Sequence, residues 1–251
     1  MSAASGSYLE VFSEFRTYDN YNELFEVTMS KLTSELNLSS VKSCLAVGPG
    51  DGEYEVAFIK QCVSNISQFI AVEPDHESLE LLRTRLAKSL PDVDSQVIET
   101  KIESWEALDE PVDLVLLMCV LYYISANDRK QLFKKLHDRW LTTGGYMVVV
   151  NSSGTKCPGN ICEIYERLDQ PVPAWEDIET ELLQVGFIKQ FADVMKCVRD
   201  FSTVDEHLVR FMQNYMHRPI TLDQVRGVVQ QLFPDKKCDQ MIYTLAVFQK
   251  A

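Results

Sequence analysis

The sequence predicts an α/β fold, in which a doubly wound and mostly parallel β-sheet carries helices on both faces. Short apolar segments alternate with helix-like segments from about residue 42 to residue 151, a pattern typical of strands joined by helices. The strand-like segments are largely apolar, as expected for strands buried on both faces of a sheet. A glycine-rich turn follows the first strand directly, at 48–52.

The core elements follow from this alternation in chain order. Strands are predicted at 43–47, 68–73, 95–100, 113–124 and 146–153, and helices at 53–64, 76–90 and 125–141. The last helix begins with residues that commonly cap helices and continues with apolar Leu132, Phe133 and Leu136. We therefore expect a Rossmann-like core at 37–151.

The segments on either side of this core are predicted to complete one compact domain. Residues 1–36 are expected to form a helical cap, because Tyr8, Phe12 and Phe15 recur at helical spacing. This stripe would either pack as an ordinary amphipathic face or line a pocket, and spacing alone favours packing. Residues 152–251 are expected to complete the sheet and cover the pocket. Helices are predicted there at 161–168, 176–187 and 203–233, and strands at 191–201 and 241–251.

The composition argues against several classes of function. The chain has 251 residues and a formal net charge of −13. This charge opposes binding to nucleic acid or to an anionic membrane, because phosphate recognition needs clustered Lys and Arg. The longest apolar run, 114–124, is too short to span a bilayer, and the first residues show no signal peptide. The seven cysteines lack metal-ligand spacing, so we expect reduced thiols, no metal and a cytoplasmic location. We also expect a monomer.

A glycine-rich turn marks the candidate ligand site. Gly48, Gly50 and Gly52 directly follow a buried strand and open a helix. A side chain at such a turn would block a ligand from the backbone, and the helix N-terminus offers free N–H donors. Glu73 ends the next strand, where a carboxylate can accept hydrogen bonds from both hydroxyls of a ribose. The glycines alone would also fit a structural turn, but the order of strand, turn, helix, strand and acid favours a nucleoside site.

Two cofactor classes fit this site, the nicotinamide dinucleotides and S-adenosylmethionine. The dinucleotide fingerprint spaces its glycines G-x-G-x-x-G/A around a pyrophosphate. Here the spacing is G-x-G-x-G, and Glu53 occupies the position of the third glycine, where its charge would oppose a pyrophosphate. S-adenosylmethionine has no phosphate and carries a positive sulfonium group. The methyl donor is therefore preferred, and a nicotinamide-dependent oxidoreductase is the alternative.

Later segments supply further candidate contacts. The segment 101–108 follows the third strand, where acidic and aromatic residues often close over an adenine, although exposed acids at a helix start explain it equally well. The fourth strand leads to Cys119, Tyr122 and Tyr123, where an acceptor would meet the donor methyl. The other residues expected to contact the donor are Pro74, Ser78, Glu103, Ser104 and Met118.

Seven segments, spread over most of the chain, share the pattern of one known family. They are YLEVFSEF at 8–15, LAVGPGDGE at 45–53, VEP at 72–74, LYYI at 121–124, VVVNSSG at 148–154, WEDIETELLQVGF at 175–187 and TLAVFQKA at 244–251. In these segments the chain resembles the histamine N-methyltransferase family of class I methyltransferases. The glycine turn is generic to such enzymes, whereas VEP and LYY are specific in combination.

The resemblance implies a donor site at the three glycines and Glu73, and an acceptor pocket beside it. That pocket would be lined by Tyr8 and Phe12 together with the residues at the end of the fourth strand. The resemblance makes a pocket role for Tyr8 and Phe12 slightly favoured over packing. Trp175 is added because its chemistry suits such a pocket. The implied reaction is N-methylation of a small amine or imidazole-type molecule.

Three positions depart from the family pattern. In the family pattern an acidic residue contacts the substrate amine, and this chain has Tyr21 at the corresponding position. The pattern also has an asparagine on the last strand, where this chain has Tyr243. We therefore expect an acceptor other than histamine, held by stacking and cation–π contacts. Many class I enzymes carry an acid on the first strand where this chain has Ala46. The amino group of the donor must then find another acceptor.

The expected mechanism is in-line transfer of the methyl group by proximity. The protein holds a neutral nitrogen close to the methyl group and excludes water, so we assign no general acid or base. The four histidines lie outside the motif positions. The rival to an enzyme is a non-catalytic protein that binds S-adenosylmethionine, and the changes at Ala46, Tyr21 and Tyr243 lend it support.

Overall fold

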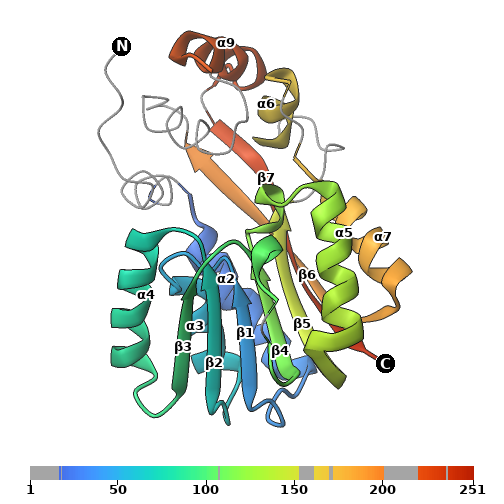
Figure 1. Cartoon of the computed structure of the whole chain (residues 1–251). Coiled ribbons are helices and arrows are strands. Elements are labelled where there is room, and N and C mark those ends of the chain that lie inside the picture. The colour runs from blue at the N-terminus through green and yellow to red at the C-terminus, as the bar shows by residue number, and fades with distance from the viewer. Residues whose placement is uncertain are drawn as a thin grey trace.

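A computed structural model of the chain describes residues 17, 19–106, 108–152, 161–169, 172–200, 220–235 and 237–251. In this part of the chain one seven-stranded sheet has the order β3-β2-β1-β4-β5-β7-β6 (Figure 1). Strands β1 to β5 pair in parallel, and β7 lies antiparallel to both of its neighbours. The predicted doubly wound, mostly parallel α/β fold is confirmed.

The elements have the following bounds. The strands are β1 Ser43–Val47, β2 Gln68–Glu73, β3 Asp94–Glu99, β4 Val112–Met118, β5 Leu141–Ser152, β6 Phe187–Asp200 and β7 Lys237–Lys250. The α-helices are α2 Tyr21–Glu35, α3 Glu53–Cys62, α4 His76–Ser89, α5 Ala126–Lys135, α6 Ile161–Arg167, α7 Trp175–Val185 and α9 Leu222–Leu232. Short 3-10 helices lie at Ile102–Ser104 and Leu121–Tyr123, and a π-helical turn at Leu136–Trp140 extends α5.

Two hydrophobic cores lie on the two faces of the sheet. Helices α2, α3 and α4 cover one face, and α5 and α7 cover the other (Figure 1). Side chains of β1 alternate between these cores, with Cys44 and Ala46 on the α3 side and Leu45 and Val47 on the α5 side. All four are buried, which explains why this strand is apolar throughout.

The fourth strand is shorter than predicted. β4 ends at Met118, and Cys119 has a left-handed backbone conformation with a φ of 55°. A strand cannot continue through such a residue, so the chain turns into the 3-10 helix at Leu121–Tyr123. The backbone N–H of Cys119 still donates to the carbonyl of Val150, at 2.8 Å. The chain therefore leaves the sheet at the carboxyl end of β4, with Cys119 at the exit.

The last three strands all begin earlier than predicted, and β7 begins at Lys237. β5 starts at Leu141, and β6 starts at Phe187, immediately after Gly186 ends α7 with a φ of 111°. The predicted C-terminal strand is β7, which lies between β5 and β6. Its register places Tyr243 opposite Ser152, the last residue of β5. The C-terminal strand therefore brings Tyr243 to the carboxyl edge of the parallel strands.

Helix α2 lies over the sheet and is tied to the edge strand β6. The hydroxyl of Thr28 donates to Asp193 at 2.8 Å, and Lys31 forms an ion pair with the same carboxylate at 2.8 Å. Although partial burial raises the pKa of Asp193, the bonds from Lys31 and Thr28 lower it overall. The earlier part of the predicted N-terminal helix, 8–16, lies outside the described residues. Among the helices that the structure describes, none combines the length and the apolar composition that a membrane span requires.

Candidate donor and acceptor site

A cavity of about 460 Å³ lies at the carboxyl ends of β1, β2 and β4. Its lining residues are Val47, Gly48, Pro49, Gly50, Tyr54, Glu55, Val72, Glu73, Pro74, Asp75, Lys101, Ile102, Glu103, Met118, Cys119, Val120, Tyr123 and Ile124. The volume suits a ligand of nucleoside size. Of the lining residues that the structure describes, four are acidic and one is basic, so this part of the cavity favours a cationic ligand over a phosphorylated one.

The turn after β1 exposes its backbone to this cavity. Gly48 and Gly50 have φ values of 59° and 58°, which side-chain-bearing residues rarely adopt. A Cβ on Gly48 would lie 2.4 Å from Cγ2 of Val120, so this glycine allows the turn to pack against the exit from β4. A Cβ on Gly50 would have no described atom within 4 Å, which leaves space for a ligand. Gly52 is different, because it packs against Leu82 of α4 and does not line the cavity.

The carboxylate of Glu73 is fixed at the end of β2. Its side chain is buried, and Oε2 accepts a hydrogen bond from the N–H of Gly50 at 2.9 Å. Oε1 accepts from the N–H of Asp75, also at 2.9 Å. Burial raises the pKa of Glu73 above its usual value, although the two backbone hydrogen bonds act in the opposite direction. Each oxygen retains acceptor capacity, so this carboxylate can also bind ligand hydroxyls.

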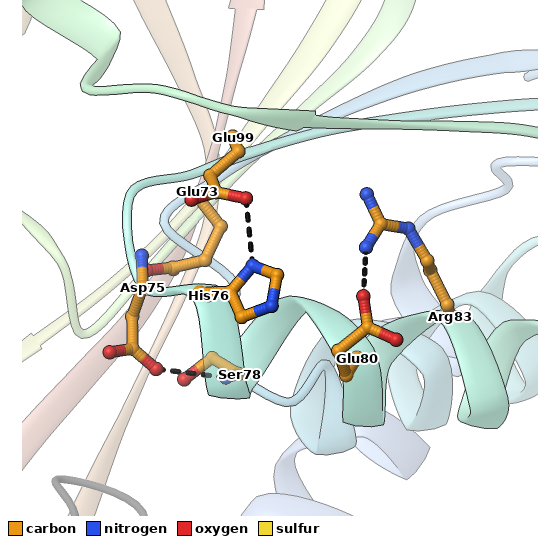
Figure 2. Close-up of polar contacts among 7 residues, drawn as sticks. All are labelled: Glu73, Asp75, His76, Ser78, Glu80, Arg83 and Glu99. Carbon is orange, nitrogen blue, oxygen red and sulfur yellow. Dashed lines mark hydrogen bonds and ion pairs between the residues drawn. The ribbon is translucent and has the colours of Figure 1, made fainter.

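The residues after Glu73 begin helix α4 (Figure 2). Asp75 caps the helix, since its Oδ2 accepts from the N–H of Ser78 at 2.8 Å. Ser78 itself is fully buried outside the cavity lining, and its hydroxyl has no hydrogen-bond partner in the described part of the chain. On the exposed side, Nδ1 of His76 lies 2.9 Å from Oε2 of Glu99, and this carboxylate raises the pKa of His76.

Arg85 of α4 anchors the glycine turn through Asp51. Its Nε donates to the carbonyl of Asp51 at 2.9 Å, and its Nη2 forms an ion pair with the Asp51 carboxylate at 2.8 Å. Bidentate contacts of this kind fix geometry as well as distance. Sequence reasoning missed this pair, although an acid inside the glycine turn is a signal that a cation could lie nearby.

An aromatic cluster adjoins the cavity on the side of α2. The ring of Tyr21 meets the rings of Tyr54 and Tyr243 edge to face, with centroids 5.1 and 4.9 Å apart. Its hydroxyl lies 4.0 Å from Sγ of Cys119. Burial, followed by the neighbouring Cys119 and tyrosines, raises the pKa of Tyr21 well above its usual value. Tyr21 therefore contributes a neutral phenol to this cluster.

The structure brings eight of the residues proposed from the sequence to the cavity wall. They are Gly48, Gly50, Glu73, Pro74, Glu103, Met118, Cys119 and Tyr123. Tyr21 and Tyr243 lie behind this wall, where Tyr21 contacts the lining residues Tyr54 and Cys119. Tyr122 lies against Tyr123, with ring centroids 4.8 Å apart, and neither Tyr122 nor Ser104 lines the cavity. The positions proposed at Tyr8 and Phe12 lie outside the described residues.

Trp175 differs most from its expected position. It begins α7, belongs to the core on the α5 side of the sheet and packs near Phe248 of β7, at 6.2 Å between ring centroids. Aromatic character alone does not distinguish a core tryptophan from a pocket tryptophan. The structure corrects this expectation.

Sequence reasoning also missed several lining residues. The first turn of α3 contributes Tyr54 and Glu55, and Lys101 and Asp75 complete the wall. The hydroxyl of Tyr54 donates to Asn22 of α2 at 2.7 Å, so this residue links α3 to α2. A helix that starts at a glycine turn places its first turn at the ligand edge of the sheet, and this placement could have made Tyr54 and Glu55 candidates.

Comparison with known proteins agrees with this geometry. Residues 44–145 match the family model described as a methyltransferase domain. The structure is similar to that of protein BH2331 from Bacillus halodurans C-125, with a TM-score of 0.64, 16% identity, and coverage of 88% of this chain and 98% of that chain. It is also similar to the N-methyltransferase NodS from Bradyrhizobium japonicum WM9 in complex with S-adenosyl-L-homocysteine. That similarity has a TM-score of 0.54, 14% identity, and coverage of 90% and 87% of the two chains.

A third similar structure is the cyclopropane synthase MmaA2 from Mycobacterium tuberculosis. It has a TM-score of 0.59 and 13% identity, and the similarity covers 89% of this chain and 83% of that chain. At these identities the structural matches establish the fold alone. A sequence comparison with curated proteins found no match.

The strand order with its antiparallel β7 defines a class I methyltransferase fold. Within this fold, residues 44–145 match a methyltransferase domain, and S-adenosylmethionine is the cofactor that this match indicates. The cavity fits this molecule, because the space beside Gly50 is open, the Glu73 carboxylate is fixed beside it, and the charged lining residues that the structure describes are mainly acidic.

Proposed function

We propose that this chain transfers a methyl group from S-adenosylmethionine to a nitrogen atom of a small amine or imidazole-type molecule other than histamine. The observation that carries the proposal is the neutral aromatic cluster of Tyr21, Tyr54 and Tyr243, which adjoins an acidic donor cavity through Cys119. Aromatic faces attract flat or cationic nitrogen compounds.

On the donor side, Glu73 would bind the ribose hydroxyls. The backbone of the turn at Gly48 and Gly50 would lie directly against the donor molecule. Glu103 and Met118 line the same cavity and are proposed to contact the adenine end. S-adenosylmethionine supplies a methyl group bound to a positively charged sulfur. The protein's part is to hold the two reactants in line and to exclude water.

On the acceptor side, Cys119 and Tyr123 lie where the chain leaves β4. The strained backbone of Cys119 directs this exit towards Tyr21, and the network from Tyr54 to Asn22 holds α2 over the cavity. These residues would position the acceptor nitrogen. Tyr8 and Phe12 are proposed to add to this wall from the N-terminal segment.

Among the residues that the structure describes, none of those lining the cavity is a histidine. We propose that the acceptor nitrogen reacts as the neutral species with its own lone pair, so that transfer needs no general base. For an imidazole-type acceptor, kcat/KM should then rise with pH through the pKa of the acceptor itself.

A methylation screen with isotope-labelled donor tests the proposed function. Imidazoles, biogenic amines and dipeptides would be offered in parallel, and the position of the label would be assigned by mass spectrometry. We expect labelled N-methyl product from at least one compound, together with S-adenosyl-L-homocysteine. Donor binding without turnover across the panel would instead favour the second candidate, a non-catalytic donor-binding protein, for which the absence of an acid at Ala46 is the supporting observation.

A further inference from the structure

The glycine turn beside the donor cavity is a β-turn built around a flexible residue. The N–H of Gly52 donates to the carbonyl of Pro49 at 2.9 Å, so Gly50 and Asp51 are its two central residues. Gly50 has a φ of 58°, and turns with a positive φ at the first central position favour glycine. Because glycine has no side chain to restrict its backbone, contacts from outside the turn must hold its conformation.

Two charged side chains hold this turn from opposite sides. On the cavity side, the carboxylate of Glu73 accepts the N–H of Gly50 at 2.9 Å. On the side of α4, Nε of Arg85 donates to the carbonyl of Asp51 at 2.9 Å, and Nη2 pairs with the Asp51 carboxylate at 2.8 Å. Since both the carbonyl and the side chain of Asp51 are held, Arg85 fixes the direction of this residue as well as its distance from α4.

Helix α4 also supports the end of the turn by packing. A Cβ on Gly52 would lie 2.2 Å from Cδ1 of Leu82, so the turn lies directly on this helix. The side chains of Arg85 and Asp51 are 34% and 14% exposed, so their ion pair is partly shielded from solvent. Among the described residues that line the cavity, neither Arg85 nor Asp51 is found. An effect of Arg85 on a bound ligand must therefore pass through the turn.

We propose that Arg85 is a positioning residue for the methyl donor, which keeps the turn at 49–52 in the conformation that S-adenosylmethionine binds. A turn that exchanges between conformations accepts a ligand only in the fraction of molecules that have the competent one. Contacts that hold this conformation in advance raise the affinity without touching the ligand. The proposal rests on the donor site described above, and it gives the ion pair of Arg85 with Asp51 a role in binding.

A direct contact with the donor is the competing role for Arg85, because a guanidinium group could pair with the carboxylate of the methionine part. The geometry argues against it, since Nε and Nη2 of Arg85 are both engaged with Asp51. The two roles differ in kinetics. Loss of a positioning contact lowers the association rate of the donor, because fewer molecules are competent at any moment. Loss of a direct contact raises the dissociation rate.

Binding kinetics of S-adenosyl-L-homocysteine, measured by surface plasmon resonance, test the proposal. The variants are Arg85→Met, Asp51→Ala and the two combined. Arg83→Met is the control, because it removes the same charge from the same helix, where Arg83 forms an exposed pair with Glu80 (Figure 2). Calorimetry of each variant should give the wild-type stoichiometry, which shows that the donor site is folded.

We expect Arg85→Met to lower the association rate about tenfold, as for loss of a hydrogen bond between charged groups, and to leave the dissociation rate within about twofold of the wild type. Asp51→Ala should slow association in the same way. The combined variant should show less than the product of the two effects, because both substitutions break one contact. Arg83→Met should bind like the wild type.

Three results would overturn the proposal. An affinity loss in Arg85→Met that comes mainly from faster dissociation would assign Arg85 to a direct contact with the donor. Wild-type rates in Arg85→Met would mean that the ion pair has no part in binding. Effects of Arg85→Met and Asp51→Ala that multiply in full would show that Arg85 does not act through Asp51. A wild type that does not bind S-adenosyl-L-homocysteine would instead refute the donor site as a whole, which is a different failure.

Discussion

At the scale of single residues, neighbouring carboxylates differ in what surrounds them. Glu73 and Glu99 are register partners at the ends of β2 and β3. Glu73 is buried and accepts two backbone hydrogen bonds, whereas Glu99 is exposed and pairs with His76 (Figure 2). The sequence identified Glu73 by its place at the strand end. It could not show that the glycine turn itself holds this carboxylate, because that contact depends on how β1 and β2 pair.

The first prediction concerns Glu73. Glu73→Ala should weaken binding of S-adenosyl-L-homocysteine by about 1.5–3 kcal/mol, because a charged hydrogen-bond acceptor for the ribose is lost. Isothermal titration calorimetry measures this change. Glu99→Gln is the control, since it alters the register partner outside the cavity and should leave the affinity unchanged. An unaltered affinity in Glu73→Ala would remove this residue from the donor site.

The second prediction concerns His76. Its pKa should lie above the ordinary value for histidine in an NMR titration, because Glu99 accepts its hydrogen bond and stabilises the charged ring. Glu99→Gln should bring the pKa back towards the ordinary value. Since the folded-state pKa is raised, this pair stabilises the fold at pH values below the unfolded pKa. The contribution is lost as the pH rises through the folded pKa. A histidine that titrates identically in both proteins would contradict the contact.

At the scale of elements, polar contacts tie the helices to one another around the sheet. Arg129 of α5 forms two hydrogen bonds with Glu181 of α7, at 2.6 and 2.8 Å, and Arg129 is buried. Periodicity predicted both helices, and they pair because both cover the same face of the sheet. The same reasoning did not find the exit at Cys119, because a left-handed residue after an apolar strand leaves no periodic signal.

The third prediction concerns the contact between α5 and α7. Arg129→Ala should lower the free energy of unfolding by about 3 kcal/mol, because it leaves the Glu181 carboxylate without its buried partner. The double variant Arg129→Met with Glu181→Leu should recover most of the loss. Lys134→Ala, which breaks the exposed pair with Asp138, is the control and should cost less than about 1 kcal/mol. Urea denaturation measures all three. Equal losses in the buried and exposed pairs would refute this account.

The fourth prediction concerns the contact between α2 and β7. Tyr21 and Tyr243 stand where the resemblance to histamine N-methyltransferases would place polar anchors, and their rings pack against each other. A test of acceptor choice should therefore replace both tyrosines in one double variant. Tyr21→Glu with Tyr243→Asn should raise kcat/KM for histamine about tenfold, as expected for a gained charge-assisted contact. If the unaltered protein already methylates histamine as efficiently as any other amine, these tyrosines do not determine acceptor choice.

At the scale of the whole molecule, the site is assembled from distant parts of the chain. The glycine turn, Glu73 and the exit from β4 come from the parallel core, while Tyr21 and Tyr243 come from near the two ends. Local sequence patterns predicted the glycine turn, Glu73 and the end of β4, because each of them directly follows or ends an apolar strand that the sequence itself indicates. They could not predict that β7 lies between β5 and β6, or that Trp175 packs on the far face, because both depend on long-range pairing.

The most direct test of the central claim is a calorimetric comparison of two cofactors on the unaltered protein. S-adenosyl-L-homocysteine and NADH would be titrated separately under identical conditions. The acidic cavity and the open turn at Gly50 predict stoichiometric, saturable binding of S-adenosyl-L-homocysteine and no saturable binding of NADH. Saturable binding of NADH, with none of S-adenosyl-L-homocysteine, would contradict the assignment of this cavity to the methyl donor.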